Sequence, residues 1–258
     1  LFLQDTYSPA LIEGNSKRHI DVGYLIKKGL PFYFDIITNK NRLIHYLYPH
    51  ERQSLAFASS QPQSAPQITS HKFSRDAVEL HCFSHDREKP FFISLLTHLK
   101  SRLDPDGIDP NGSERRQAEL KALIEIYLET EAKFNNKVPI LVAGDFNGNA
   151  SENSTDPEFN DLYSKTQLRD ACALSQIPDN QRVSFYQVGR SHTDGRQIDY
   201  CFLSPLLAKY LNKSSTKIYR FKNTKGEELP PPANLEIKSY LPSDHYPLIF
   251  EVNSLPMK

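Results

Sequence analysis

The stretch VPILVAGDFNGNASENS, from Val138 to Ser154, decides the fold, because an apolar run ends in it at a polar motif. Apolar and small residues extend from Pro139 to Ala143, and Gly-Asp-Phe-Asn follows at once. A strand buried in a sheet has such a continuous apolar run. The stretch therefore predicts a buried strand that presents Asp145 and Asn147 at one edge of a sheet. Taken alone, the motif also fits an ordinary turn, because Asp, Asn and Gly all favour turns.

The segments around this strand predict further strands and one long helix. From Ser113 or Glu114 to about Lys133, apolar residues recur at helical spacing, with charged residues between them. A shorter helix is expected from Asp161 to Cys172, and the polar residues 51–70, with two prolines, are expected to form a surface loop. Strands are expected at 19–26, 73–84, 90–101, 183–188, 197–205 and 243–252. Because the long helix joins two strands, the pattern indicates a layered α/β or α+β domain, with no domain boundary within residues 1–258.

Composition limits the classes of function. The formal net charge of the 258 residues is zero, so bulk electrostatics gives no case for nucleic acid or a membrane surface. No apolar run approaches the length of a membrane span. The three cysteines are odd in number and lack a C-x-x-C pattern, which predicts buried thiols. The first residues, LFLQDTYSPALIEGN, resemble neither a signal peptide nor a natural start, so we expect a trimmed chain and leave cytoplasmic and secreted locations open.

Polar groups follow apolar runs at four predicted strand ends. They are His98, the pair Asp145 and Asn147, Asp199, and the pair Asp244 and His245. Burying such groups costs several kcal/mol unless they are paired or bind a cation. Each also has a structural explanation when taken singly: a hydrogen-bonded rim histidine, a turn, a structural ion pair with an arginine, and a cap or turn. The combination, in this order, is more specific than any one of its parts.

Five pieces of the sequence together resemble the endonuclease/exonuclease/phosphatase superfamily, which includes DNase I-like nucleases, neutral sphingomyelinases and inositol polyphosphate 5-phosphatases. The pieces are FSRDAVEL, FFISLLTHLKS, PILVAGDFN, QIDYCFLS and SDHYPLIF, and the resemblance extends from about Ile20 to Glu251. It implies a single domain with a four-layer αββα sandwich of the DNase I-like type. It also implies an active site at one end of the sandwich, where the strand edges meet.

The resemblance also implies roles for five residues in the hydrolysis of a phosphodiester by water. Asp145 would orient and deprotonate the attacking water, and Asn147 would donate its amide to a phosphate oxygen or to that water. His245 would contact the phosphoryl oxygens, and Asp199 would fix the tautomer of that imidazole. His98 would protonate or hydrogen-bond the leaving oxygen.

Metal and phosphate binding are implied in the same way. Mg²⁺ or Mn²⁺ would be the cofactor, with Asp244 as a metal carboxylate. Arg75 would bind the substrate phosphate; the alternative is a structural ion pair with Asp76 or Glu79. Asp21 is a looser candidate for the group that orients His98.

Two family features are not visible in the sequence. The family normally has a first strand with an Asn, and a second strand that ends in Gln-Glu and supplies the principal metal ligand. The nearest candidates here are Gln4-Asp5 and Glu13. We therefore expect that the N-terminal strand or strands, with the main metal ligand, are missing from this chain.

The implied function is a metal-dependent phosphodiester hydrolase that acts as a monomer, with nucleic acid as the favoured substrate. The basic residues Lys100, Arg102, Arg115 and Arg116 would meet a phosphate backbone; the alternative is a solvated loop and helix start. Two other functions stay open. One is a phosphatase or a sphingomyelinase-like phosphodiesterase on a small or lipid substrate, and the other is a non-catalytic binding module that keeps the fold.

Overall fold

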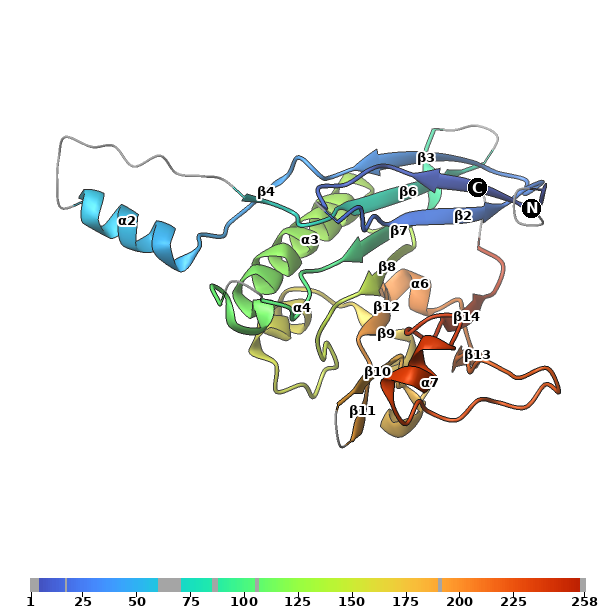
Figure 1. Cartoon of the computed structure of the whole chain (residues 1–258). Coiled ribbons are helices and arrows are strands. Elements are labelled where there is room, and N and C mark those ends of the chain that lie inside the picture. Colours follow the sequence, from blue (N-terminus) through green and yellow to red (C-terminus); the bar gives the residue numbers. More distant parts are fainter. Residues whose placement is uncertain are drawn as a thin grey trace.

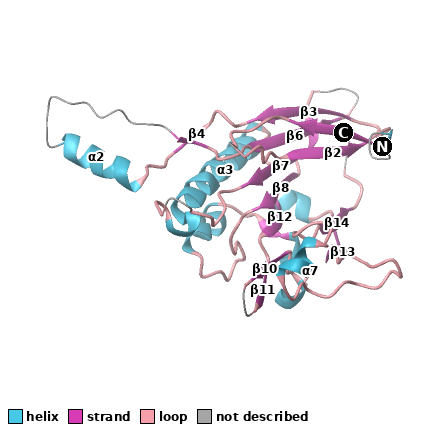
Figure 2. Cartoon of the chain, viewed as in Figure 1, coloured by secondary structure: helices cyan, strands magenta, loops and turns pink. Residues whose placement is uncertain are grey.

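The computed structural model describes residues 5–16, 18–59, 71–84, 88–104, 107–189 and 192–255. A six-stranded sheet forms the centre of this part of the chain (Figures 1 and 2). Its strand order is β3 (Tyr33–Thr38), β6 (Ala77–Phe83), β7 (Pro90–His98), β8 (Ile140–Asp145), β12 (Asp199–Leu203) and β9 (Arg169–Asp170). Neighbouring strands are antiparallel except β7 and β8, which run parallel. Because parallel neighbours need a long crossover, the long helix lies between these two strands in sequence.

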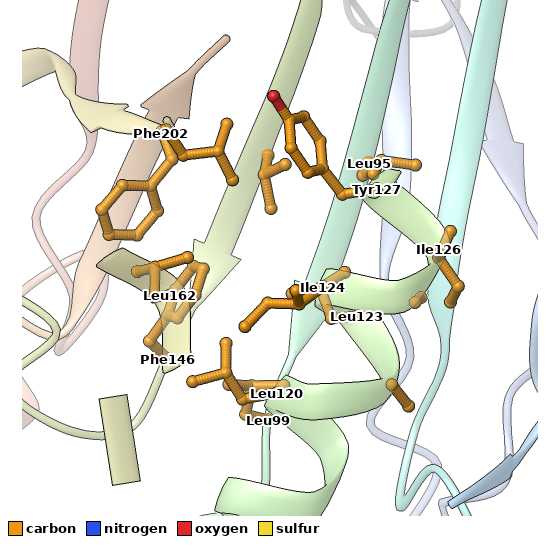
Figure 3. Packing of buried hydrophobic residues seen from close by; sticks show 14 of the residues in the cluster. Leu95, Leu99, Leu120, Leu123, Ile124, Ile126, Tyr127, Phe146, Leu162 and Phe202 are labelled. Atoms are coloured by element: carbon orange, nitrogen blue, oxygen red, sulfur yellow. The ribbon is translucent and has the colours of Figure 1, made fainter. Parts of the chain in front are cut away.

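That crossover is helix α3 (Ser113–Lys133), which covers one face of the sheet as the apolar spacing predicts. Its buried residues Leu120, Leu123, Ile124 and Tyr127 belong to the main core cluster. Figure 3 shows these side chains directed at Phe146, Leu162 and Phe202 from the adjoining elements. Burial of each such side chain contributes roughly 1.5–3 kcal/mol. The long helix is thus held by its apolar stripe.

The opposite face of the sheet carries a second core cluster. Phe92, Leu141 and Cys201 lie on β7, β8 and β12, where the two-residue period of a strand alternates side chains between the faces. They pack against the buried cluster that includes Leu211 of β13 (Leu211–Ile218), and Phe250 of β14 (Leu248–Val252) packs against the same cluster. A helix, a central sheet and a second, smaller sheet therefore lie in successive layers. The expected layered α/β class is confirmed, with a central multi-strand sheet and helices.

The remaining described strands form small sheets. The pairs are β1 with β2, β4 with β5, β10 with β11, and β13 with β14. Their bounds are β1 (Tyr7–Leu11), β2 (Gly23–Lys27), β4 (Leu43–Ile44), β5 (His71–Lys72), β10 (Phe185–Val188) and β11 (Thr193–Arg196). Four short helices complete this part: α4 (Asn160–Lys165), α5 (Ala171–Leu174), α6 (Pro205–Ala208) and α7 (Leu235–Ser239). None of the helices in the described ranges is long and apolar enough to cross a bilayer.

Two sequence expectations need correction. Residues 49–59, of which 51–59 fall in the expected loop, form helix α2 (Pro49–Ser59), which stands away from the sheet in Figure 1. The helix forms because Pro49 occupies its first turn and Glu51 accepts the Tyr48 backbone N–H at 2.6 Å. Both prolines of residues 51–70 lie outside the described residues. The expected helix from Asp161 to Cys172 is interrupted by β9, which pairs with the edge of the central sheet.

The three cysteines are free thiols, as expected. Cys82 and Cys172 are buried and Cys201 is partly buried. Burial raises the pKa of the Cys82 thiol to about 12 and, with a smaller effect from the Asp170 carboxylate, that of Cys172 to about 12. Protonated thiols are poor nucleophiles and poor metal ligands. Their contribution is to packing.

Candidate active site

Three of the expected side chains lie together because of the strand register. The parallel pair β7 and β8 places His98 opposite Asp145, each at the last position of its strand. Strand β12 runs antiparallel to β8 and begins at Asp199, again opposite Asp145. Two carboxylates and an imidazole from three neighbouring strands therefore meet at one edge of the sheet. Residues about 50 positions apart in the sequence come together through backbone pairing alone.

The glycine of the Gly-Asp-Phe-Asn motif permits a close approach between two strands. Gly144 has a φ of +140°, and a Cβ placed there would lie 1.8 Å from the carbonyl oxygen of Thr97 on β7. Any side chain would therefore separate β7 from β8 at the point where both strands end. Phe146, directly after Asp145, is fully buried against Tyr200 and Phe202. The motif thus fixes the backbone on both sides of Asp145.

Asp199 and His245 form a hydrogen-bonded pair, as the resemblance implies. Nδ1 of His245 lies 2.9 Å from Oδ2 of Asp199. Because a carboxylate can only accept, Nδ1–H is the donor, and Nε2 remains for another partner. Burial lowers the pKa of His245, but the hydrogen bond that Nδ1–H donates to Asp199 and the charges of Asp199 and Asp145 outweigh it and raise the pKa overall. The pair therefore favours the imidazolium form, which can donate to an anionic oxygen.

Asp145 has an unusual proton affinity for a carboxyl group. Burial, and next the nearby charge of Asp199, raise the pKa of Asp145 to about 7. A general base works best when its pKa lies near the working pH. The Asp145 carboxyl is therefore poised to exchange a proton near neutrality in the metal-free chain.

His98 lies beside Asp145, with Nε2 3.4 Å from Oδ2 of that carboxyl. Burial lowers the pKa of His98 to about 3, and the positive charge of Arg75 acts in the same direction. The imidazole of His98 is therefore neutral near pH 7, and its contact with the Asp145 carboxyl is not an ion pair. The looser candidate Asp21 accepts a hydrogen bond from the Gly14 backbone at 2.8 Å, and the described hydrogen bonds include none between Asp21 and His98.

Asn147 holds the Asp145 carboxyl in place. Its backbone N–H donates to Oδ1 of Asp145 at 2.8 Å, and its side-chain amide donates to Oδ2 at 3.2 Å. The same amide donates to the carbonyl of Leu99 at 3.0 Å. With a φ of +53°, Asn147 occupies the left-handed region that Asn tolerates better than most residues. In this arrangement the amide orients the carboxyl, and its expected contact with substrate stays a prediction.

Arg75 lies at the same edge of the sheet as Asn147, although it precedes the first residue of strand β6. Its guanidinium is buried, and Nη1 donates to the Leu99 carbonyl at 3.2 Å, the acceptor that Asn147 also uses. Burial lowers the pKa of Arg75, while the charges of Glu119 and Asp145 partly offset this effect. The alternative ion pairs are not seen, because the Asp76 carboxylate accepts from Thr38 and Asn39, and that of Glu79 contacts Asn39 and His81.

Asp244 lies apart from this group. Its side chain is exposed, and Oδ2 is 3.6 Å from Nζ of Lys238. Its role as a metal carboxylate stays a prediction. Of the N-terminal candidates, Glu13 is exposed and its backbone carbonyl accepts from Lys40, and Asp5 is also exposed. Gln4 lies outside the described residues.

One residue that positions the pair of Asp199 and His245 could not be predicted from sequence. The buried Ser184 hydroxyl oxygen accepts the backbone N–H groups of Ile198 and Asp199, both at 3.0 Å. Its carbonyl accepts the backbone N–H of Tyr246 at 2.7 Å. Ser184 thus ties the start of β12 to the segment that carries His245. A serine in a short apolar run has no pattern that reveals such a contact.

The donor set fits a hard divalent cation in part. Ligand atoms of Asp145, Asp199 and His245 all lie within 4.8 Å of one another, and no second group of this kind is found among the described residues. Mg²⁺ prefers oxygen ligands and commonly binds one or two carboxylates, several waters and substrate phosphate oxygens. The two carboxylates of the group match that preference for oxygen, and the imidazole of His245 does not.

Comparison with known proteins supports the fold from a distance. No protein-family model and no curated protein matches the sequence. The human Nocturnin catalytic domain, solved with a bound sulfate anion, superposes with a TM-score of 0.52 at 16% identity, covering 97% of this chain and 74% of that one. TDP2 from D. rerio, complexed with a single-strand DNA product, gives 0.50 at 13% identity over 95% of this chain and 77% of that one.

A third similar structure, TDP2 from C. elegans, has a TM-score of 0.50 and 16% identity, with 95% of this chain covered. This chain spans 57% of that protein's length. At such low identities the likeness concerns the fold. The chain therefore has the DNase I-like fold that the sequence resemblance implied.

Proposed function

We propose that a chain with this fold and this strand-edge site is a divalent-metal-assisted phosphoester hydrolase. The observation that carries the proposal is the Asp199–His245 pair, hydrogen bonded at 2.9 Å, beside an Asp145 carboxyl whose pKa is raised to about 7. Folding alone does not require charged groups to gather at a sheet edge, because their burial costs free energy. Phosphoester hydrolysis requires such a gathering.

Each residue takes a role in one in-line displacement. Asp145 accepts a proton as the oxygen of a water molecule bonds to phosphorus and the bond to the leaving oxygen breaks. His245, held by Asp199, donates from Nε2 to a non-bridging oxygen. Arg75 adds positive charge on the same side, and the neutral His98 offers a hydrogen bond to the leaving oxygen, which takes its proton from solvent.

Metal binding is part of the proposal. Asp244 would bind Mg²⁺ or Mn²⁺, as the resemblance implies, and Asp145 would keep its carboxylate for the proton of the attacking water. When bound, the cation would neutralise charge on the phosphoryl oxygens. Hydrolysis assays with Mg²⁺ and with Mn²⁺ distinguish the two ions.

Nucleic acid remains the substrate class that the sequence resemblance favours. Among the similar structures, D. rerio TDP2 was solved with a single-strand DNA product. The basic residues expected to meet a nucleic acid backbone, however, have internal partners. Arg116 is buried against Glu158, at 2.6 Å, and Arg102 binds Asp156 at 2.7 Å. The other two are engaged as well: Arg115 binds Glu119 and the Tyr48 hydroxyl, and the Lys100 ammonium donates to the Ser101 and Leu103 carbonyls. This arrangement leaves the lipid or small-molecule alternative open.

The test is hydrolysis of bis-p-nitrophenyl phosphate and p-nitrophenyl phosphate by the purified chain, with Mg²⁺, Mn²⁺ or EDTA. We expect metal-dependent release of nitrophenol that falls by about 10²–10⁴-fold in His245→Gln. His50→Gln, which changes an exposed histidine stacked on Tyr48, is the matched control and should keep full activity. Equal activity in both variants would remove His245 from the mechanism. No turnover of either ester with either metal would favour the non-catalytic module.

A further inference from the structure

Helix α3 carries a completely buried carboxylate, that of Glu119. Burying a carboxylate costs free energy unless hydrogen bonds and opposite charge compensate for the lost water. Here Oε1 accepts the backbone N–H of Ser74 at 2.8 Å, and Oε2 accepts that of Lys100 at 2.7 Å. Oε1 also accepts from Nε of Arg115 at 3.3 Å. One side chain therefore holds two segments of the chain, one that leads into β6 and one that leaves β7.

Both of these segments contribute to the candidate active site. Ser74 directly precedes Arg75, and Lys100 directly follows Leu99. The Leu99 carbonyl accepts Nη1 of Arg75 at 3.2 Å and the side-chain amide of Asn147 at 3.0 Å. The two N–H groups that Glu119 binds are thus next in sequence to Arg75 and to the acceptor that Arg75 shares with Asn147. A shift of this carboxylate would move both.

A second buried side chain of α3 holds the same backbone from its other polar group. Arg116 lies three residues before Glu119, on the same side of the helix. Its Nη1 donates to the carbonyls of Lys100 at 3.1 Å and Asn111 at 3.0 Å, and its Nη2 donates to Glu158 at 2.6 Å. The N–H and the C=O of Lys100 are therefore both fixed by side chains of one helix.

Glu119 also balances the charge of Arg75. Burial lowers the pKa of Arg75, and the Glu119 carboxylate is the largest of the opposing effects, ahead of Asp145. Within the described part of the chain, the hydrogen bonds from the Arg75 guanidinium all use Nη1, to the Leu99 carbonyl and the Ser74 hydroxyl. Because backbone N–H groups occupy the Glu119 carboxylate, it offers Arg75 its charge and leaves Nη2 as a donor for a substrate oxygen.

We propose that Glu119 is a positioning residue for the hydrolysis: it holds Arg75 at the sheet edge, where the guanidinium binds the substrate phosphate. Arg116 supports it by fixing the backbone of Lys100 from the other side. Both side chains are buried, so they act through Arg75 and do not touch the substrate. This inference rests on the proposed function for its kinetic half, and the placement of Arg75 can be measured without turnover.

The placement test is the hydrogen-exchange rate of the Arg75 Nε–H group, measured by NMR and assigned from its absence in Arg75→Gln. Glu119→Gln keeps the shape of the side chain but removes its charge, and its amide nitrogen faces a backbone donor. Exchange at Arg75 should therefore rise by at least about tenfold. Unchanged exchange overturns the inference, whether or not the chain hydrolyses an ester.

The matched control is Asp170→Asn, which changes another buried carboxylate that accepts two backbone N–H groups. Asp170 is 3% exposed and accepts from Cys172 at 3.3 Å and Ala173 at 3.2 Å, at the start of α5. Its substitution should lower stability as well, but it should leave exchange at Arg75 and kcat per folded molecule unchanged. Equal effects of the two variants on Arg75 exchange would overturn the inference, because loss of stability alone would then explain them.

The kinetic test is a double-mutant cycle on the hydrolysis of bis-p-nitrophenyl phosphate. Glu119→Gln alone should lower kcat per folded molecule by about 10–100-fold, because a small displacement of a substrate-binding group is costly to turnover. In the Arg75→Gln background the same substitution should lower kcat by less than about twofold, since the residue through which it acts is gone. An equal loss in both backgrounds overturns the inference, because Glu119 would then act independently of Arg75.

A second variant keeps the inference testable if Glu119→Gln does not fold. Glu119→Asp retains the charge but is too short to reach both N–H groups, so it should lower kcat by about threefold or more, again only when Arg75 is present. Exchange at Arg75 that depends on Glu119, without hydrolysis of any ester, supports the placement and overturns the proposed function. Hydrolysis with full kcat in both Glu119 variants supports the proposed function and overturns the positioning role.

Discussion

Among the histidine–carboxylate pairs of the described residues, two have similar geometry in different settings. At the sheet edge, His245 and Asp199 are 2.9 Å apart, with side chains 33% and 23% exposed. Within the central sheet, on β6, His81 and Glu79 are 2.7 Å apart, with side chains 5% and 10% exposed. The first pair joins residues 46 positions apart, and the second joins residues two apart on the same face of one strand.

The difference separates a chemical role from a structural one. Strand alternation places His81 beside Glu79, and Asn39 donates to the same carboxylate at 3.0 Å, so the inner pair satisfies its own polar groups. The outer pair leaves Nε2 of His245 for a partner and needs Ser184 to hold its two segments together. A substitution in the outer pair should therefore affect turnover, and one in the inner pair should affect stability.

The largest expected effect is that of Asp199→Asn on turnover. The amide is close in shape to the carboxylate but lacks the charge that favours the His245 imidazolium, so kcat for bis-p-nitrophenyl phosphate should fall by about 10²–10⁴-fold. Stability should change by less than about 1 kcal/mol, because the pair is partly exposed. Steady-state kinetics and urea unfolding measure the two quantities. A loss of stability with unchanged kcat would assign the outer pair to the fold.

The second prediction uses two buried serines with the same local chemistry. Ser184→Ala removes the acceptor of two backbone N–H groups next to Asp199, and Ser204→Ala removes that of Ile140 and Leu207 at the far end of β12. Both should destabilise the fold by about 2 kcal/mol. Only Ser184→Ala should also lower kcat per folded molecule, by about tenfold. Equal kcat in the two variants would show that Ser184 does not position Asp199.

Part of the fold and of the candidate site could be predicted from the sequence. Strand β8, helix α3 and strand β12 were predictable because apolar periodicity and the Gly-Asp-Phe-Asn edge are local signals. The meeting of Asp145, Asp199 and His245 was expected from the resemblance. Strand register places Asp199 opposite Asp145, and an isolated bridge to Phe185 positions His245.

What sequence missed depends on long-range contacts or on departures from the usual pattern. Ser184 has a role only because two distant segments reach it. Helix α2 is polar, and apolar spacing does not mark such a helix. Helix α7 has five residues and buries most of its Lys238 side chain, so periodicity would assign this lysine to the wrong side. The position of Asp244 against Lys238 likewise follows from this helix.

The third prediction concerns the inner pair. Glu79→Gln keeps the size of the side chain but weakens the charge-assisted contact with His81, so the free energy of unfolding should fall by about 1–3 kcal/mol. Turnover by the folded fraction should not change, because β6 carries no residue of the site. Urea unfolding and kcat corrected for folded protein measure the outcome. A drop in kcat comparable to that of Asp199→Asn would contradict the division of roles.

The smallest expected effect is the pH dependence of that stability difference. Burial raises the pKa of Glu79, but the hydrogen bonds from His81 and Asn39 outweigh it, so the folded-state pKa lies below the ordinary value of 4.5. The ionised carboxylate is thus favoured in the folded state, and its contribution is fully present above pH 4.5 and is lost as the pH falls through the folded-state pKa. The urea midpoints of the wild type and Glu79→Gln should therefore differ by a constant amount at neutral pH and converge in acid. Midpoints that diverge below pH 4.5 would mean that the fold favours the protonated carboxyl, and the hydrogen bonds of His81 and Asn39 would then not stabilise the ionised form of Glu79.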